Sequence, residues 1–204
     1  MAFSELLVDA LTAFIEDLGL LGIFLTMAAE SCLIPIPSEV VMPFAGYVAW
    51  LKSSELFLGY SVAAATIGNL LGSTILYYIG LRLGKAFIEK YGKYFLLRRR
   101  EVELAERWFL KYGGYAVFFG RMTPAIRTVI SLPAGLFEFD FKKFAVLTLI
   151  GSIPWNLFLV YLGYLSGPYW KMILEYSTFI DVAAVIGLAV FLLLIFWKTR
   201  RNLS

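Results

Sequence analysis

Four charged side chains occupy two proline-bearing breaks in otherwise apolar sequence. The first break runs from Glu30 to Glu39, with two prolines between the acids, and the second runs from Arg121 to Arg127, with one proline between the bases. Arginine stays charged and presents a planar fork that fits phosphate or carboxylate. Neighbouring carboxylates suit a site that takes up and releases protons. The two breaks therefore predict a site that binds an anion and exchanges protons.

Two interpretations of these four charges are open. Burying them singly near the centre of a bilayer would cost on the order of 10 kcal/mol, so they must be paired, hydrated or functional. They either form a static salt-bridge cluster that locks the two breaks together or mark a pathway for substrate or protons. Both interpretations hold if a substrate phosphate displaces a carboxylate from an arginine.

Four further polar or proline positions are candidate supports of this site. Pro35, Pro37 and Pro124 free backbone groups that must find partners inside protein or around a wet cavity. Asn156 lies within a long apolar run. It either contacts substrate or the polar breaks, or forms an interhelical hydrogen bond.

The composition indicates a membrane protein and excludes several kinds of site. Of the 204 residues 60% are apolar and 16% charged, with a mean hydropathy of +0.78, whereas a soluble domain is about half apolar and about a quarter charged. The absence of His excludes histidine bases and ligands, and the lone Cys32 cannot form an internal disulfide or a cysteine metal cage. We expect no catalytic residue, metal or cofactor, and no nucleic-acid partner.

The apolar runs predict an all-α polytopic protein that forms a single membrane domain over residues 1–204. A spanning helix needs about 20 apolar residues, and shorter runs that meet at a polar break are typical of re-entrant hairpins. Helical spacing of apolar residues near the N-terminus predicts an amphipathic helix. The expected elements are an amphipathic helix at 3–18, re-entrant hairpins at 22–51 and 113–137, and transmembrane helices at 57–81, 144–165 and 179–197.

Matching spacings of glycines and of the polar breaks indicate an internal repeat, with one copy at 22–84 and the other at 113–167. Gly68, Gly80 and Gly84 have the same spacings, 12 and 4, as three glycines from Gly151 onward. Glycine is common in transmembrane helices, which is the alternative explanation. If each unit is a hairpin followed by one crossing helix, consecutive units have opposite orientation. This is the inverted repeat in which two broken elements meet near the midplane.

The distribution of charge predicts the orientation. Of the 18 basic residues, 9 lie in the connector 82–112, 2 are Lys142 and Lys143, and 3 follow Trp197. Lys and Arg gather in cytoplasmic loops. We therefore place the basic connector at 85–112 and the C-terminus in the cytoplasm.

Several motifs resemble those of the DedA family of integral membrane proteins, also described as SNARE-associated or VTT-domain proteins. They are the first break with Pro-Ile-Pro-Ser-Glu39, the string Gly-Arg-Met-Thr-Pro-Ala-Ile-Arg127 with Ser131-Leu-Pro-Ala-Gly135 after it, and Gly151-Ser-Ile-Pro-Trp-Asn156. The resemblance covers about residues 20–170.

The resemblance implies a bacterial or archaeal plasma-membrane protein with two facing re-entrant hairpins. Members of the family are linked to moving lipids across the bilayer, including polyprenyl (undecaprenyl) phosphate carriers and phospholipids, and dependence on the proton motive force has been proposed. The family's two essential acids map onto Glu30 and Glu39, and its two essential arginines onto Arg121 and Arg127.

Residues and resemblance together favour a transporter or flippase for a phosphorylated lipid, with membrane lipids and protons as partners. Two alternatives stay open: a membrane-embedded lipid-modifying enzyme and a passive lipid scramblase. Against the enzyme stand the absence of His and of a recognisable nucleophile–base arrangement. The identity of the lipid, the direction of transport and the oligomeric state do not follow from the sequence.

Overall fold

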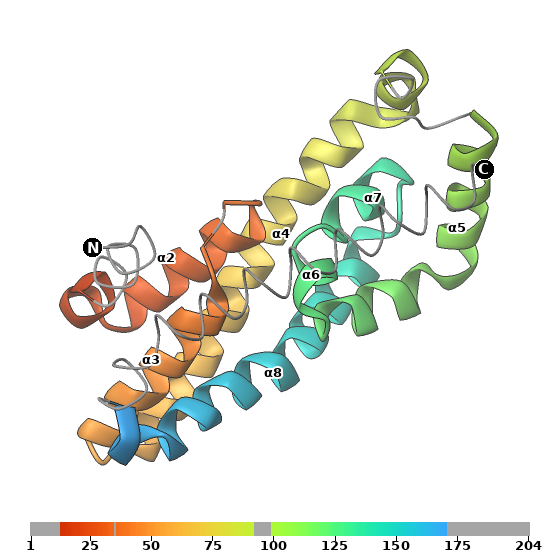
Figure 1. The fold of residues 1–204 in the computed structure, drawn as a ribbon. Coiled ribbons are helices and arrows are strands. Elements are labelled where there is room, and N and C mark those ends of the chain that lie inside the picture. The colour runs from red at the N-terminus through yellow and green to blue at the C-terminus, as the bar shows by residue number, and fades with distance from the viewer. Residues whose placement is uncertain (1–12, 35, 92–98, 171–204) are drawn as a thin grey trace, which may run out of the picture. The chain divides into compact units, whose positions relative to one another are not determined.

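The computed structural model describes residues 13–34, 36–91 and 99–170, and every regular element in them is helical (Figure 1). Residues 13–18 are helical, and a 3₁₀ turn, η2, covers Gly167–Tyr169. The other helices are α2 (Leu20–Ser31), α3 (Ser38–Leu51), α4 (Glu55–Tyr91), α5 (Arg99–Arg121), α6 (Pro124–Arg127), α7 (Ser131–Leu136) and α8 (Phe141–Leu165). The all-α prediction is confirmed for the described residues.

Some predicted elements lie wholly or partly outside the described residues. These are the transmembrane helix at 179–197, the amphipathic helix at 3–18 apart from residues 13–18, and positions 92–98 of the basic connector. The chain divides into two compact units, Met1–Leu165 and Ser166–Ser204. All the candidate site residues belong to the first unit.

Among the described residues, two helices are long and apolar enough to cross a membrane, Glu55–Gly84 of α4 and Phe141–Leu165 of α8. The predicted spans at 57–81 and 144–165 coincide with them. Gly84 ends the apolar part of α4 in a left-handed conformation (φ 60°), which glycine adopts without a Cβ penalty. Many large apolar side chains of α4 and α8 are exposed, as expected of helices that face lipid.

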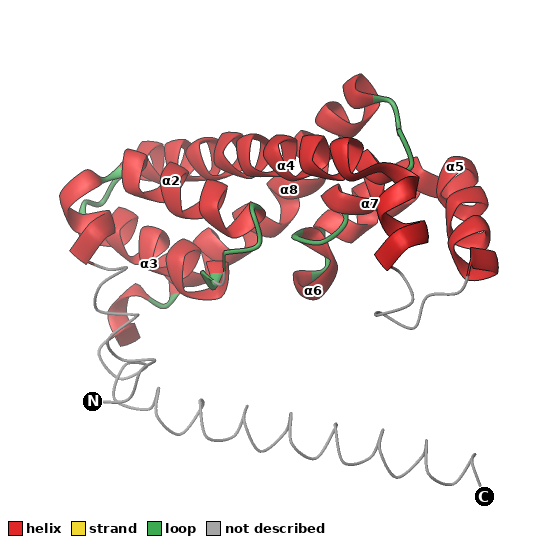
Figure 2. Cartoon of the chain, turned by 90° about the horizontal axis from the view of Figure 1, so that it is seen from above, coloured by secondary structure: helices red, strands yellow, loops and turns green. Residues whose placement is uncertain are grey.

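The two long helices pack against each other in opposite directions. The Asn69 side chain of α4 contacts Asn156 of α8, and eight residues further along α4 the Tyr77 ring lies 4.9 Å from the ring of Phe144. The Tyr77 hydroxyl also donates to the carbonyl oxygen of Phe139. Figure 2 shows α2 and α3 beside one part of this pair, and α6 and α7 beside another.

Both polar breaks interrupt helices where the sequence predicts. The first separates α2 from α3, and Leu33 within it has a positive φ of 67°. The second follows α5, contains the single turn α6, and leads into the short helix α7. Pro37 precedes α3 in an extended conformation, and Pro124 opens α6. Proline is tolerated at both places because neither residue must donate a helical hydrogen bond.

Helix α3 packs on α8 at a contact that requires glycine on both sides. A Cβ at Gly46 would collide with the carbonyl oxygen of Val160, and a Cβ at Gly163 would collide with the backbone of Pro43. Backbones that approach this closely are typical of small residues between membrane helices. The first break's outgoing helix is thereby held against the second long helix.

The contact between α4 and α7 repeats this arrangement. A Cβ at Gly135 would collide with the carbonyl oxygen of Tyr77, and a Cβ at Gly80 would collide with that of Leu132. Each short helix therefore packs on the long helix of the other sequence half. The residues of this contact correspond one by one to those of the α3–α8 contact, at shifts of 89 positions for the short helices and 83 for the long ones.

Candidate functional site

The two polar breaks meet in a buried ion pair. The Nη2 atom of Arg127, on α6, donates to Oε2 of Glu30, near the end of α2. The two side chains are 5% and 8% exposed. Buried charges of this kind are stabilised only by good pairing and further hydrogen bonds. The pair joins two segments that lie 97 positions apart in the chain.

Arg121 lies beside this pair with its charge uncompensated. The residue is 2% exposed; its Nη1 donates to the carbonyl oxygen of Arg127 and its Nη2 to Oγ of Ser131, each at 2.7 Å. Among the described residues no carboxylate forms a salt bridge with it, and its Nε has no partner. The three buried charges, Glu30, Arg121 and Arg127, therefore sum to +1, and the fourth charge of the two breaks, Glu39, does not pair with Arg121.

A second unpartnered polar group lies on the part of α8 that packs against Arg121. The ring of Phe144 lies 5.7 Å below Cζ of Arg121, and a Cβ at Gly151 would contact the Arg121 side-chain stem. Thr148 stands between these two positions on the same face of α8. It is fully buried, and its hydroxyl has no hydrogen-bond partner in the described structure. The Nε of Arg121 and the hydroxyl of Thr148 are both donors that can bind an anion.

A chain of side-chain hydrogen bonds runs from the residue after Glu30 across the long helices. Ser31 donates to Asn69 at 3.1 Å, Asn69 to Asn156 at 3.4 Å, and Asn156 to Thr66 at 3.1 Å. Asn156 thus forms interhelical hydrogen bonds, and the network that it belongs to reaches the first polar break through Asn69 and Ser31. The network fixes the end of α2 on α4 and α8 at the level of the ion pair.

Glu39 takes a different position from the other three charges. Its side chain is exposed, and its Oε2 accepts from Oγ of the buried Ser38 at 3.3 Å. Ser38 also lies within hydrogen-bonding reach of Glu30, and the two carboxylates are close enough to repel each other. Three of the expected four charges are therefore buried together, with Glu39 at their exposed edge. Pro35 lies outside the described residues.

Sequence reasoning did not single out the polar residues that surround the arginines. Ser131 and Thr148 were missed, and so was the run of small polar residues along the long helices. The available signal was their helical spacing within apolar sequence, because polar residues repeated every three or four positions share one face. The missed positions are Thr66, Asn69 and Ser73 on α4 and Thr148 and Ser152 on α8, which share the face of the predicted Asn156.

The described residues offer no group of three or more His, Cys, Asp or Glu side chains that could hold a metal ion. The chemistry available at the site is hydrogen bonding to an anion by two guanidinium groups and several hydroxyls, with carboxylates that can exchange protons.

Comparison with known proteins assigns the fold to a family. The model of the VTT domain matches residues 36–165, which is more than half of the chain. The chain belongs to the VTT-domain (DedA) family. The matched part of this VTT-domain protein contains Glu39, Arg121 and Arg127, whereas Glu30 lies six positions before it.

Three relatives illustrate the names that similar proteins carry. "Undecaprenyl phosphate transporter A" of Bacillus subtilis (strain 168) is 35% identical over 191 residues, covering 91% of this chain and 92% of that protein. The "Alkaline phosphatase-like protein" of Lactococcus lactis subsp. cremoris (strain MG1363) is 36% identical over 213 residues, covering 98% and 97%. "Protein DedA" of Escherichia coli (strain K12) is 28% identical over 149 residues, covering 71% and 67%. No solved structure matches the chain.

Proposed function

We propose that this VTT-domain protein transports a phosphorylated lipid across the plasma membrane. The observation that carries the proposal is Arg121: its guanidinium is 2% exposed, has no carboxylate partner among the described residues and keeps a free donor at Nε. A buried, uncompensated guanidinium is costly unless an anion occupies the site for part of the cycle. A phosphate headgroup matches its planar fork.

The architecture proposed for this function is an inverted repeat of 22–84 and 113–167. Each unit consists of a re-entrant hairpin and one spanning helix. The reciprocal glycine contacts of α3 with α8 and of α7 with α4 support this arrangement, because a two-fold axis would generate one contact from the other. The site then lies where the two broken elements meet, at the midplane.

The proposed orientation places the segment 82–112 and the first turn of α8 on the cytoplasmic side. Nine of the 18 basic residues lie in 82–112, and Lys142 and Lys143 begin α8. The positive-inside rule supports this orientation.

In the proposed cycle the ion pair acts as a switch. Uptake of a proton by Glu30 neutralises its carboxylate and releases Arg127, which then joins Arg121 on the phosphate. Loss of the proton restores the pair and expels the headgroup. Glu39, exposed beside Glu30 and linked to Ser38, is the group that exchanges protons with the aqueous side. The apolar lipid chain remains in the bilayer throughout.

The names of the relatives favour one lipid as the substrate and support one alternative activity. The name of the Bacillus subtilis relative favours undecaprenyl phosphate, a polyprenyl monophosphate, as the lipid. The name of the Lactococcus lactis relative favours a membrane-embedded phosphatase as the second candidate. A passive scramblase would use the same anion site without protons.

Reconstituted vesicles with labelled undecaprenyl phosphate test the proposal. We expect unchanged lipid to appear in the opposite leaflet, at a rate that a pH gradient alters and that Arg121→Ala abolishes. Release of inorganic phosphate would establish the phosphatase instead. Translocation that ignores the pH gradient in wild type and in Glu30→Gln alike would establish a scramblase. Full activity of Arg121→Ala would remove the proposed site.

A further inference from the structure

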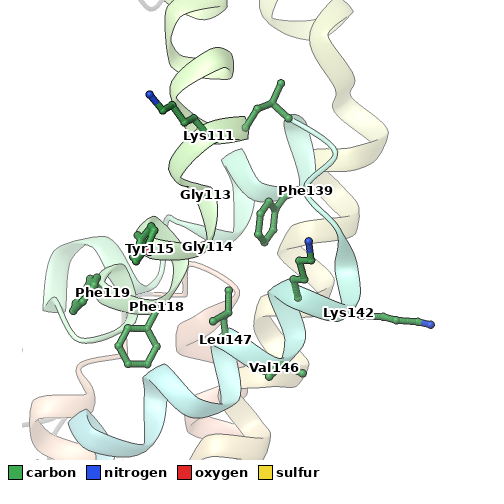
Figure 3. Close-up of a pocket in the computed structure, with 12 residues that line it drawn as sticks. Lys111, Gly113, Gly114, Tyr115, Phe118, Phe119, Phe139, Lys142, Val146 and Leu147 are labelled. Carbon is green, nitrogen blue, oxygen red and sulfur yellow. The ribbon is translucent and has the colours of Figure 1, made fainter.

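A groove of about 840 Å³ lies along the seam between α5 and α8 (Figure 3). Gly113 and Gly114 of α5 line it, and there is room for a side chain at Gly114. A Cβ at Gly114 would meet only Cδ1 of Leu147, at the ordinary contact distance of 3.6 Å. Its volume is in the range of pockets that take a small ligand.

The lining of the groove is apolar along its length and basic at its rim. Figure 3 shows Phe118, Phe139 and Leu147 around it, with Lys111 and Lys142 extending outward from the helices on either side. Its twelve lining residues include a third lysine, Lys143, and no carboxylate. An apolar channel with only positive charge at its edge complements an amphiphile with an anionic headgroup.

The groove leads towards Arg121. Gly114 lies against Leu147, and the carbonyl oxygen of Phe118 lies against Gly151, so α5 and α8 run in the same direction along the seam. The groove ends at the turn of Phe118 and Leu147. One turn further, the stem of Arg121 lies on Gly151.

We propose that this groove binds one lipid with a phosphate headgroup, its hydrocarbon chain along the α5–α8 seam and its phosphate at the lysines. The groove is the site where the transported lipid loads before its headgroup reaches Arg121; this last step rests on the proposed function. The lysines act as flexible point charges that capture the phosphate at the membrane surface, whereas Arg121 binds it with a fixed fork. Lipid binding in the groove itself does not require transport.

Binding of farnesyl phosphate and of farnesol to the purified full chain in detergent tests the groove. Gly114→Phe should fill it and weaken binding of both ligands at least tenfold. The matched control is Gly59→Phe, at an exposed position on α4 where a Cβ would meet nothing within 4 Å. Val146→Trp blocks the groove from α8 if Gly114→Phe does not fold. Equal binding by Gly59→Phe and by a folded groove-filling variant would overturn the proposal.

The lysines are tested by the difference between the two ligands. The double variant Lys142→Gln/Lys143→Gln should weaken farnesyl phosphate by about fivefold for each lysine and leave farnesol unchanged. Lys52→Gln, which removes an exposed lysine next to α3, should change neither. A loss of farnesol binding in the double variant, or no loss of farnesyl phosphate, would contradict headgroup capture.

Arg121→Ala separates this inference from the proposed function. It should lose undecaprenyl phosphate translocation in vesicles, whereas farnesol, which carries no phosphate for Arg121 to bind, should still bind in the groove. If Arg121→Ala translocates lipid like wild type while Gly114→Phe binds it weakly, the proposed function is wrong and the inference that the groove binds lipid stands. Wild-type binding and wild-type translocation by Gly114→Phe would defeat the groove and keep the function.

Discussion

Arg127 donates to the carboxylate of Glu30 across 97 positions of sequence, and this buried pair leaves Arg121 beside it without a carboxylate of its own among the described residues. The two arginines of one motif therefore have different roles. Arg127 holds the breaks together, whereas Arg121 is the group that binds the anion in the proposed function. On that proposal the polar breaks supply both a static lock and a binding site.

Replacing Arg121 should remove transport more than stability. We expect Arg121→Ala to lower lipid translocation at least 100-fold, and Arg121→Lys to restore only a small part of it, because an ammonium group cannot reproduce the two-pronged fork. Translocation in vesicles measures this. Arg82→Ala, at an exposed arginine of α4, is the control and should stay active. Equal activity of Arg121→Lys and wild type would show that charge alone suffices.

Breaking the ion pair from one side should destabilise the fold. Glu30→Gln and Arg127→Gln each leave a buried charge without its partner, at a cost of about 3–5 kcal/mol. The double variant should be more stable than either single variant, because neither member of the pair is left as a buried charge without its partner. Thermal unfolding in detergent of all four proteins gives the coupling energy. Additive losses would mean that the two side chains do not interact in the membrane-protein fold.

Thr148→Val tests whether the Thr148 side chain binds the lipid phosphate or only packs in the core. The hydroxyl of Thr148 is fully buried without a partner, so removing it should raise stability by about 1 kcal/mol. If the hydroxyl helps Arg121 to hold phosphate, the same variant should raise the KM for the lipid several-fold. Unfolding temperature and translocation kinetics are measured together. Unchanged KM in a stabilised variant would leave Thr148 without a role in binding.

The reciprocal glycine contacts predict matched effects in the two halves. Gly46→Ala and Gly135→Ala should each cost about 1–3 kcal/mol, since a Cβ at either position collides with a carbonyl oxygen of the facing long helix. Gly59→Ala, in open space, should be neutral or slightly stabilising. Unfolding in detergent provides the comparison. A large loss at one position and none at the other would argue against an inverted repeat.

Asn156→Leu tests the network that links the long helices to the first break. It leaves Asn69 and Thr66 without their shared partner, and unsatisfied buried polar groups cost about 1–3 kcal/mol each. We expect lower stability and a reduced translocation rate, because the end of α2 that carries Glu30 is no longer fixed. Asn156→Gln, which keeps the amide, should recover part of both. Equal loss in the two variants would point to packing alone.

The sequence by itself determined the helical class, the two long apolar helices and the places where the helices break. These features depend on local quantities: the length of an apolar run must match the bilayer, and proline with charge interrupts a helix wherever it stands. For this reason the runs at 57–81 and 144–165 coincide with the apolar parts of α4 and α8. The motif around Arg121 and Arg127 was sufficient for the family.

Only the tertiary structure decided which charges meet. The sequence offered a balanced quartet, but the packing of α2, α5, α6 and α8 pairs Glu30 with Arg127, leaves Glu39 exposed and places Arg121 over the ring of Phe144. Such choices depend on how far each helix is rotated about its axis and how closely two backbones approach. Those quantities are fixed by contacts between segments far apart in the chain, and no local pattern of residues contains them.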